Sequence, residues 1–103
     1  MNQEDFNKAI QEQVARSLET LTRKGEEYAT EDRLHNFKMA AGLQGITQKQ
    51  ALAALLAKHI VSVYDMIWTD SGYPISQWNE KIGDSINYLL ILRAMVDSEL
   101  FHP

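Results

Sequence analysis

Apolar residues recur every three or four positions along most of this chain, which is the spacing of one face of an α-helix. On an otherwise polar segment at the start of the chain, the stripe consists of Phe6, Ile10, Val14, Leu18 and Leu21. We therefore predict a first helix over about residues 3–24, with one buried face. Gly25 is a natural end for this helix, and residues 26–29 are predicted to form a short turn.

The same spacing predicts two more helices before residue 69. A short one covers about residues 32–42, and its inward face consists of Leu34, Phe37 and Ala41. A long one covers about residues 48–68, and its apolar stripe consists of Leu52, Leu56, Ile60, Val63 and Ile67. Thr47 and Gln50 match a capping box at the start of the long helix, in which each side chain satisfies a free backbone N–H.

A fourth helix is predicted over about residues 76–100, with Ser76 as its N-cap. Its first half has one apolar face, made by Trp78, Ile82, Ile86 and Leu89. Residues 89–96 are apolar nearly all round, which is typical of a helix buried on several sides. In a chain this small, a second subunit is the natural cover. We therefore predict a compact all-α bundle of about four helices that forms a homodimer or homotetramer.

Composition narrows the class of protein. A chain of 103 residues, 45% of them hydrophobic, predicts one domain over residues 1–103. No stretch of about 20 residues is apolar and free of charge, and the start is acidic and polar, so we expect a cytoplasmic protein without a membrane span or signal peptide. The absence of cysteine excludes disulfides and thiolate chemistry. The net charge of −4 argues against nucleic acid as a partner.

Two polar stripes interrupt the apolar helices. Glu80, Asp84 and Asn87 lie at i, i+4 and i+7 on the last helix. Lys58 and Asp65 belong to a stripe with the same spacing on the preceding helix. A short loop joins the two helices, so we expect them to be antiparallel. The pattern therefore predicts that two carboxylates from the last helix and one from the preceding helix converge.

Converging carboxylates repel each other unless a cation lies between them. Mg²⁺, or Mn²⁺, is the natural candidate, because Mg²⁺ takes oxygen ligands and binds through carboxylates and substrate phosphates. Lys58 or Lys81 would then hold a phosphate as a point charge. Simpler interpretations stay open, since an acidic stripe is more often a solvated face and surface ion pairs contribute little. His59 is interpreted as a packed histidine rather than a ligand.

Residues 80–90 read Glu-Lys-Ile-Gly-Asp-Ser-Ile-Asn-Tyr-Leu-Leu. This segment resembles the last core helix of the MazG-like, all-α nucleotide pyrophosphohydrolases, which reads roughly Glu-Glu-x-Gly-Asp followed by an apolar run. The chain is also similar to small phage and prophage relatives of that superfamily, which carry four short motifs in order. The matching residues are Lys24 to Tyr28, Asn36-Phe37, Lys58-His59, and Asp84 with Asn87-Tyr88.

The resemblance implies Mg²⁺-dependent hydrolysis of a nucleoside triphosphate to the monophosphate and pyrophosphate. The implied metal ligands are Glu27, Asp65, Glu80 and Asp84. The residues implied to contact phosphate are Lys58 or Lys81. Those implied to face the base or the sugar are Asn36 or Asn87.

The chain departs from the family pattern at two positions. The helix before the last usually reads Glu-x-x-Glu in the superfamily, whereas here it offers a single acid, Asp65. The residue three positions before Asp84 is usually acidic, whereas here it is Lys81. A non-catalytic helical module, such as a phage accessory protein that assembles or binds a host protein, therefore stays open as an alternative. A helical DNA-binding regulator is disfavoured by the acidic balance.

Overall fold

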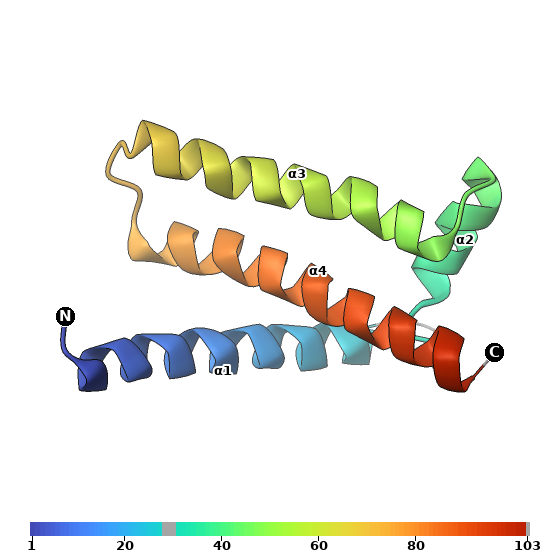
Figure 1. Ribbon diagram of the computed structural model, residues 1–103, viewed down its shortest axis with the longest axis horizontal. Coiled ribbons are helices and arrows are strands. Elements are labelled where there is room, and N and C mark those ends of the chain that lie inside the picture. The colour runs from blue at the N-terminus through green and yellow to red at the C-terminus, as the bar shows by residue number, and fades with distance from the viewer. Residues whose placement is uncertain (28–30, 103) are drawn as a thin grey trace.

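The structure is a computed structural model that describes residues 1–27 and 31–102. Within these residues the chain is all-helical, as predicted, and forms four helices without a strand (Figure 1). The helices are α1 (Gln3–Glu27), α2 (His35–Gln44), α3 (Gln48–Thr69) and α4 (Ile75–Phe101). Their bounds lie within three residues of the predicted ones.

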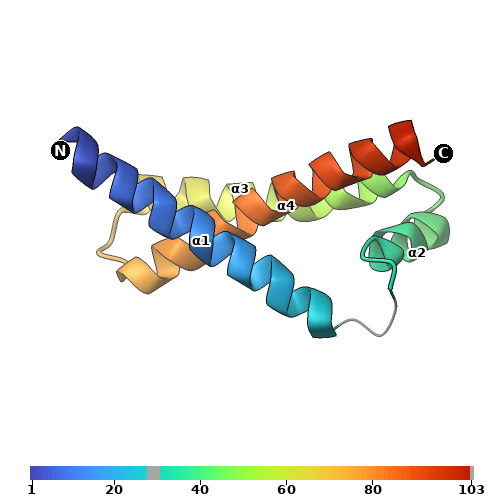
Figure 2. The same cartoon turned by 90° about the horizontal axis from the view of Figure 1, so that it is seen from below.

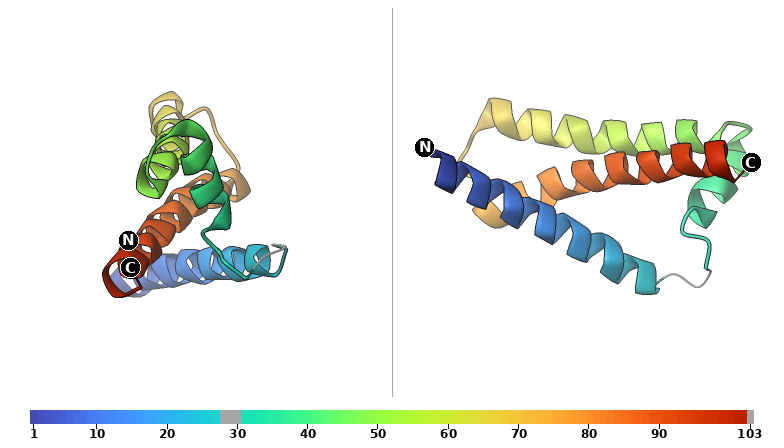
Figure 3. Two further views of the ribbon diagram at one scale, coloured as in Figure 1. Left: turned by 90° about the vertical axis from the view of Figure 1, so that its right-hand side faces the viewer. Right: turned by 60° about the horizontal axis from the view of Figure 1, so that its bottom comes forward.

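Helix α4 is the centre of the arrangement. It packs antiparallel to α3 on one side and against α1 on the other, while α2 packs against the start of α3 across one end (Figures 1 and 3). Helix α1 crosses α4 obliquely, and the two termini lie at opposite ends of the long axis (Figure 2). The fold is elongated, with extents of 45 × 27 × 25 Å, because α1, α3 and α4 are long helices of 25, 22 and 27 residues that run roughly along its long axis.

The ends of the helices are set by local chemistry. The predicted capping box is present: the Gln50 backbone N–H donates to Thr47 Oγ1 over 3.1 Å, and the Thr47 N–H donates to Gln50 Oε1 over 2.9 Å. The prediction of Ser76 as the N-cap of the last helix is wrong, since Pro74 holds that place and Ser76 lies inside the first turn. A proline ring fixes φ near the value a helix entry needs, and its missing N–H leaves no donor unsatisfied.

Gly25 does not end α1, contrary to the prediction. The helix continues to Glu27, and the Arg33 guanidinium lies directly over Gly25, where a Cβ atom would collide with it. The glycine therefore provides space for a side chain from the following segment rather than a turn. The predicted turn at residues 26–29 is helical at Glu26 and Glu27, and its remainder lies outside the described residues.

The hydrophobic core of the single chain is small. Its buried apolar residues are Ala41, Ala51, Leu52, Met66 and Met95. The predicted buried face of α1 is wrong for one copy of the chain, because Phe6, Ile10, Val14 and Leu18 are each 48–52% exposed. On α3 the predicted stripe is only partly covered: Leu52 is buried, whereas Ile60 and Ile67 are exposed.

Small and polar residues, rather than the apolar stripe, make the contact between α1 and α4. Ser17 is buried, and Gln13 Nε2 donates to the Asn79 carbonyl oxygen over 3.3 Å. A Cβ atom at Gly83 would lie 3.2 Å from Gln13 Nε2 and 3.5 Å from Ser17 Oγ, so the glycine permits the close approach. The apolar stripe of α1 lies beside this contact and is left half covered.

Helix α3 also has an uncovered apolar face, which includes Ile60, Val61, Tyr64, Ile67 and Trp68. Within the described residues it is the one helix long and apolar enough, by length and composition, to cross a membrane, with a mean hydropathy of 1.4. Core helices of soluble proteins pass the same test, although only 17% of this stretch is buried here. Both α1 and α3 thus present apolar surface that the rest of the chain does not cover.

Candidate functional site

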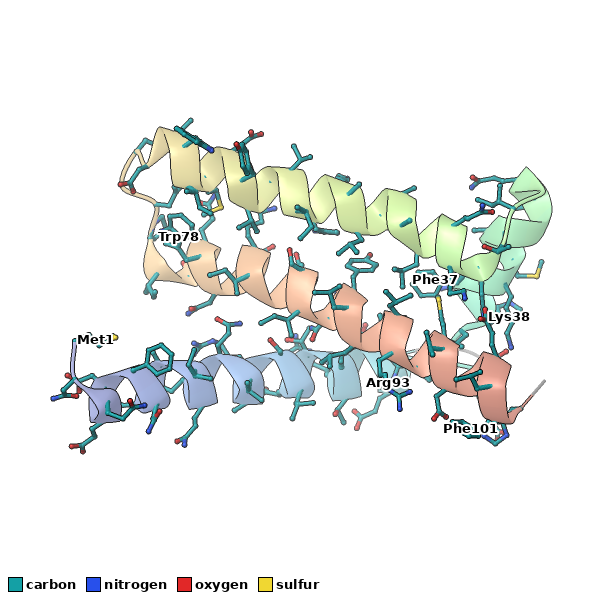
Figure 4. All side chains as sticks on the ribbon, viewed as in Figure 1. Met1, Phe37, Lys38, Trp78, Arg93 and Phe101 are labelled. Atoms are coloured by element: carbon teal, nitrogen blue, oxygen red, sulfur yellow. The ribbon has the colours of Figure 1, made fainter. Side chains whose placement is uncertain are left out.

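Two neighbouring hollows lie along α4, and the first is mostly apolar. This apolar cavity, with a volume of about 330 Å³, lies between the end of α1, the region of α2 and the second half of α4. Its apolar walls include Leu21, Leu34, Phe37, Tyr88 and Ile91. Phe37 lies at the end of the molecule where α2 crosses (Figure 4), and its ring meets that of Tyr88 edge to face at 6.5 Å. Aromatic and aliphatic walls of this size are typical of a small-molecule site.

The second hollow is a polar groove of about 470 Å³ between α1 and the first half of α4. Helix α1 contributes three cationic residues to it, Arg16, Arg23 and Lys24. Helix α4 contributes two carboxylates on the other side, Glu80 and Asp84. Oppositely charged groups on facing walls suit a ligand that carries negative charge together with a cation.

The apolar cavity and the polar groove share three residues: Lys24, Asp84 and Asn87 line both. The two hollows therefore meet at this point. A ligand with an apolar ring and an anionic tail would place the ring in one hollow and the tail in the other. The shared residues would contact the atoms that join the two parts.

Asn87 has an unsatisfied buried group at this junction. Its side chain is only 8% exposed, and its Oδ1 atom accepts no hydrogen bond from any described residue. A buried acceptor without a donor costs about 1–3 kcal/mol and therefore calls for an explanation. A ligand N–H or O–H bound at the junction would supply the missing donor.

Asp84 lies close to His59, which the sequence indicated as a packed histidine rather than a ligand. His59 of α3 places its Nδ1 atom 3.7 Å from Asp84 Oδ2, and both side chains are about a quarter exposed. The His59 ring also stacks on Tyr88, with centroids 4.9 Å apart and an interplanar angle of 26°. His59 is thus packed, as interpreted from the sequence, and it also links α3 to the carboxylate that lines both hollows.

The structure does not bring Asp65 together with Glu80 and Asp84. The side of α3 that meets α4 carries Leu52, His59 and Met66, and six residues at about 100° each turn Asp65 roughly 120° away from His59. Asp65 is exposed. Among residues 1–27 and 31–102, no group of three or more His, Asp or Glu side chains is arranged to hold a metal ion.

The remaining predicted site residues lie outside both hollows. Lys58 and Asn36 are exposed, Lys81 is half-buried, and Glu27 is the exposed last residue of α1. Tyr28, which ends the first motif of the resemblance, lies outside the described residues. Of the eight residues predicted for the site, Glu80, Asp84 and Asn87 are therefore the ones that line a hollow.

Sequence reasoning missed the cations of α1. Arg16, Arg23 and Lys24 follow one another at i, i+7 and i+8, together with Thr20 at i+4, which is a helical face in its own right. The apolar stripe is the stronger pattern on the same helix, and spacing alone does not show that the cations face α4. Within the described residues none of the three cations forms an ion pair.

No family model, curated protein or solved structure matches the chain. The likeness to MazG-like enzymes therefore rests on the short motifs alone. The residues that line the polar groove and the apolar cavity, and the charges that face each other there, therefore indicate the function.

Proposed function

We propose that this chain binds a nucleoside triphosphate in the apolar cavity and the polar groove, as a Mg²⁺-dependent pyrophosphohydrolase or a nucleotide-binding relative of such enzymes. The observation that carries the proposal is the junction at Lys24, Asp84 and Asn87, where an apolar and a charged hollow meet. A nucleotide has the same two-part chemistry, with a flat ring at one end and phosphates at the other.

The acidic wall suits a metal ion. Glu80 and Asp84 are one helical turn apart, and both line the polar groove. Mg²⁺ is commonly held by one or two carboxylates, with waters and substrate phosphates completing its ligands, so two acids suffice for this mode. Bound there, Mg²⁺ or Mn²⁺ would polarise a phosphate and lower the pKa of a water. Asn87 Oδ1 would accept a hydrogen bond from the base or the sugar.

Self-association belongs to the same proposal. The half-exposed stripe of α1 and the uncovered face of α3 are apolar surfaces of the kind that a second copy buries. We propose a homodimer or homotetramer that works in the cytoplasm, where nucleotides and Mg²⁺ are available. A member of the small phage and prophage group would fit this description.

A second candidate is a non-catalytic helical module that assembles or binds a protein partner. The lack of a three-residue metal group among the described residues favours it, as does the extent of exposed apolar surface. This alternative predicts an assembly whose stability is indifferent to metal and nucleotide.

Thermal unfolding distinguishes the two candidates, because a ligand that binds only the native state raises the midpoint. We would compare the wild-type protein with Asp84→Asn and with the control Asp97→Asn, which lies on the same helix, pairs with Arg93 and lines neither hollow. The measurement covers Mg²⁺, Mn²⁺ and the common ribo- and deoxyribonucleoside triphosphates, with chromatography of the products.

The proposal of a nucleotide site predicts a rise in the midpoint with metal plus at least one nucleotide. This rise should be kept in Asp97→Asn, and the part of it that depends on the metal should be lost in Asp84→Asn. Pyrophosphate among the products would identify the pyrophosphohydrolase rather than a binding relative. No shift with any combination would contradict the proposal and favour the non-catalytic module.

A further inference from the structure

The charge of the polar groove runs against that of the whole chain. The sequence carries a net charge of −4. The groove nevertheless has three cations on one wall and two carboxylates on the other. An acidic protein that gathers unpaired cations in one hollow creates a local field that attracts anions.

The cations form a row along one helix. From Arg16 to Lys24 the row spans eight residues, which is about 12 Å of helix rise. Arg23 lies between them, and the Thr20 hydroxyl lies on the same wall of the groove. A row of this length suits a chain of phosphates better than a single phosphate. Arginine in particular binds phosphate oxygens through two parallel N–H donors.

The row lacks an ion-pair partner in the part of the chain that the structure describes. Among the described residues none of the three side chains forms an ion pair. Neighbouring like charges are unfavourable until an anion lies between them. Asn87 lines the same groove, and its residue is more than nine-tenths buried. Its Oδ1 atom has no hydrogen-bond donor among the described residues, and a bound ligand could supply one.

We infer that Arg16, Arg23 and Lys24 bind the polyphosphate tail of the ligand directly, so that the tail binds without a divalent cation. The inference rests on the proposed nucleotide site and adds the orientation of the nucleotide in it. The base lies in the apolar cavity against Tyr88, and the phosphates extend along α1 toward Arg16. Lys58 and Lys81, the cations expected from the sequence, have no part in this contact. A metal ion on Glu80 and Asp84 would add to the binding and is not its precondition.

Titration calorimetry with inorganic tripolyphosphate in EDTA at low salt tests this inference, because the probe has no base and no metal is present. The variant is Arg16→Gln/Arg23→Gln, in which glutamine keeps a good helix former at each position. The matched control is Lys8→Gln/Lys58→Gln, which removes the same charge from exposed positions outside the groove. Circular dichroism and the unfolding midpoint confirm that both variants are folded.

The expected result is binding by the wild-type protein in EDTA. The arginine variant should bind at least about tenfold more weakly, because it loses two charge-assisted contacts with phosphate oxygens. The control variant should change the affinity for tripolyphosphate by less than about twofold. Any remaining effect of its altered net charge should disappear when added salt screens the long-range electrostatic attraction. An equal loss in both variants would overturn the inference, because it would reduce the effect to overall charge. Absence of binding in EDTA would also overturn it.

The two proposals fail separately. If a nucleotide with Mg²⁺ stabilises the protein through Asp84 but tripolyphosphate does not bind in EDTA, the nucleotide site stands and direct phosphate binding by α1 is wrong. If tripolyphosphate binds through the arginines and no nucleotide is stabilising, the anion site stands and the nucleotide proposal is wrong.

Discussion

Replacing Asn87 by leucine should make the free protein more stable and less able to bind its ligand. Asn87 Oδ1 is buried and lacks a donor in the described chain. Leucine has a similar size, needs no hydrogen bond and is the better helix former. Removing the unsatisfied acceptor recovers about 1–3 kcal/mol of unfolding free energy. For a domain of about 100 residues, each kcal/mol raises the midpoint by about 4–8 °C.

Gln48 provides a matched control for this variant. Its Oε1 atom is the other buried side-chain atom without a hydrogen-bond partner among the described residues. Gln48 lies at the start of α3 and lines neither hollow. Gln48→Leu should therefore also stabilise the protein, although the gain is smaller because the 3.4 Å hydrogen bond from Gln48 Nε2 to Glu99 Oε1 is lost. Ligand binding should stay unchanged in this variant.

Urea unfolding of the free proteins and the nucleotide-induced midpoint shift measure the two halves of this prediction. Asn87→Leu should gain stability and lose the shift, whereas Gln48→Leu should gain stability and keep it. A destabilised Asn87→Leu protein would refute the reasoning about the unsatisfied acceptor. A full ligand response in Asn87→Leu would refute its place in the site.

Three further outcomes follow from the structure. Gly42→Ala, on an open part of α2, should raise the unfolding free energy by about 0.5–1 kcal/mol. Gly25→Ala should raise it by less, because the Arg33 guanidinium above Gly25 must move. Equal gains of the two variants in urea unfolding would contradict the position of Arg33 over Gly25. Val14→Arg puts a charge into the exposed stripe of α1 and should dissociate the proposed oligomer in light scattering, and an unchanged mass would exclude this face from the interface. The hydrogen bond from Lys49 lowers the pKa of Glu99 below its ordinary value of 4.5. The ionised Glu99 side chain therefore makes a small contribution to stability above pH 4.5, and this contribution is lost as the pH falls through the lowered pKa. The midpoint difference between wild type and Glu99→Gln should accordingly vanish in acid, and a constant difference would contradict this.

Much of the fold could be predicted from local patterns. The helical spacing of apolar residues located all four helices, and the Thr47–Gln50 pair fixed the start of α3 because a capping box needs only residues that are neighbours in sequence. Gly25 misled the prediction for the opposite reason. Its role depends on Arg33, a residue eight positions away that no local rule connects to it.

The site was harder to predict because it depends on how helices are rotated. Glu80, Asp84 and Asn87 were found from their spacing on one helix, and all three line the polar groove. Asp65 was expected to join them because its stripe has the same spacing, but spacing on one helix does not say which face meets the neighbour. Packing of Leu52 and Met66 decides that rotation and turns Asp65 toward solvent.

The orientation of α1 links the uncovered apolar stripe to the cationic wall. Gln13 and Ser17 define the direction in which α1 faces α4. At about 100° per residue, the centre of the apolar stripe lies about 60° from this direction on one side of the helix. Arg16 and Arg23 lie about 90° from it on the other side. Rotating α1 to bury the stripe on α4 would improve the core of the single chain. The same rotation would turn both arginines out of the polar groove. The observed orientation thus keeps the cations beside Glu80 and Asp84 and leaves the stripe for another surface, which is the arrangement expected if ligand binding and self-association use opposite sides of the same helix.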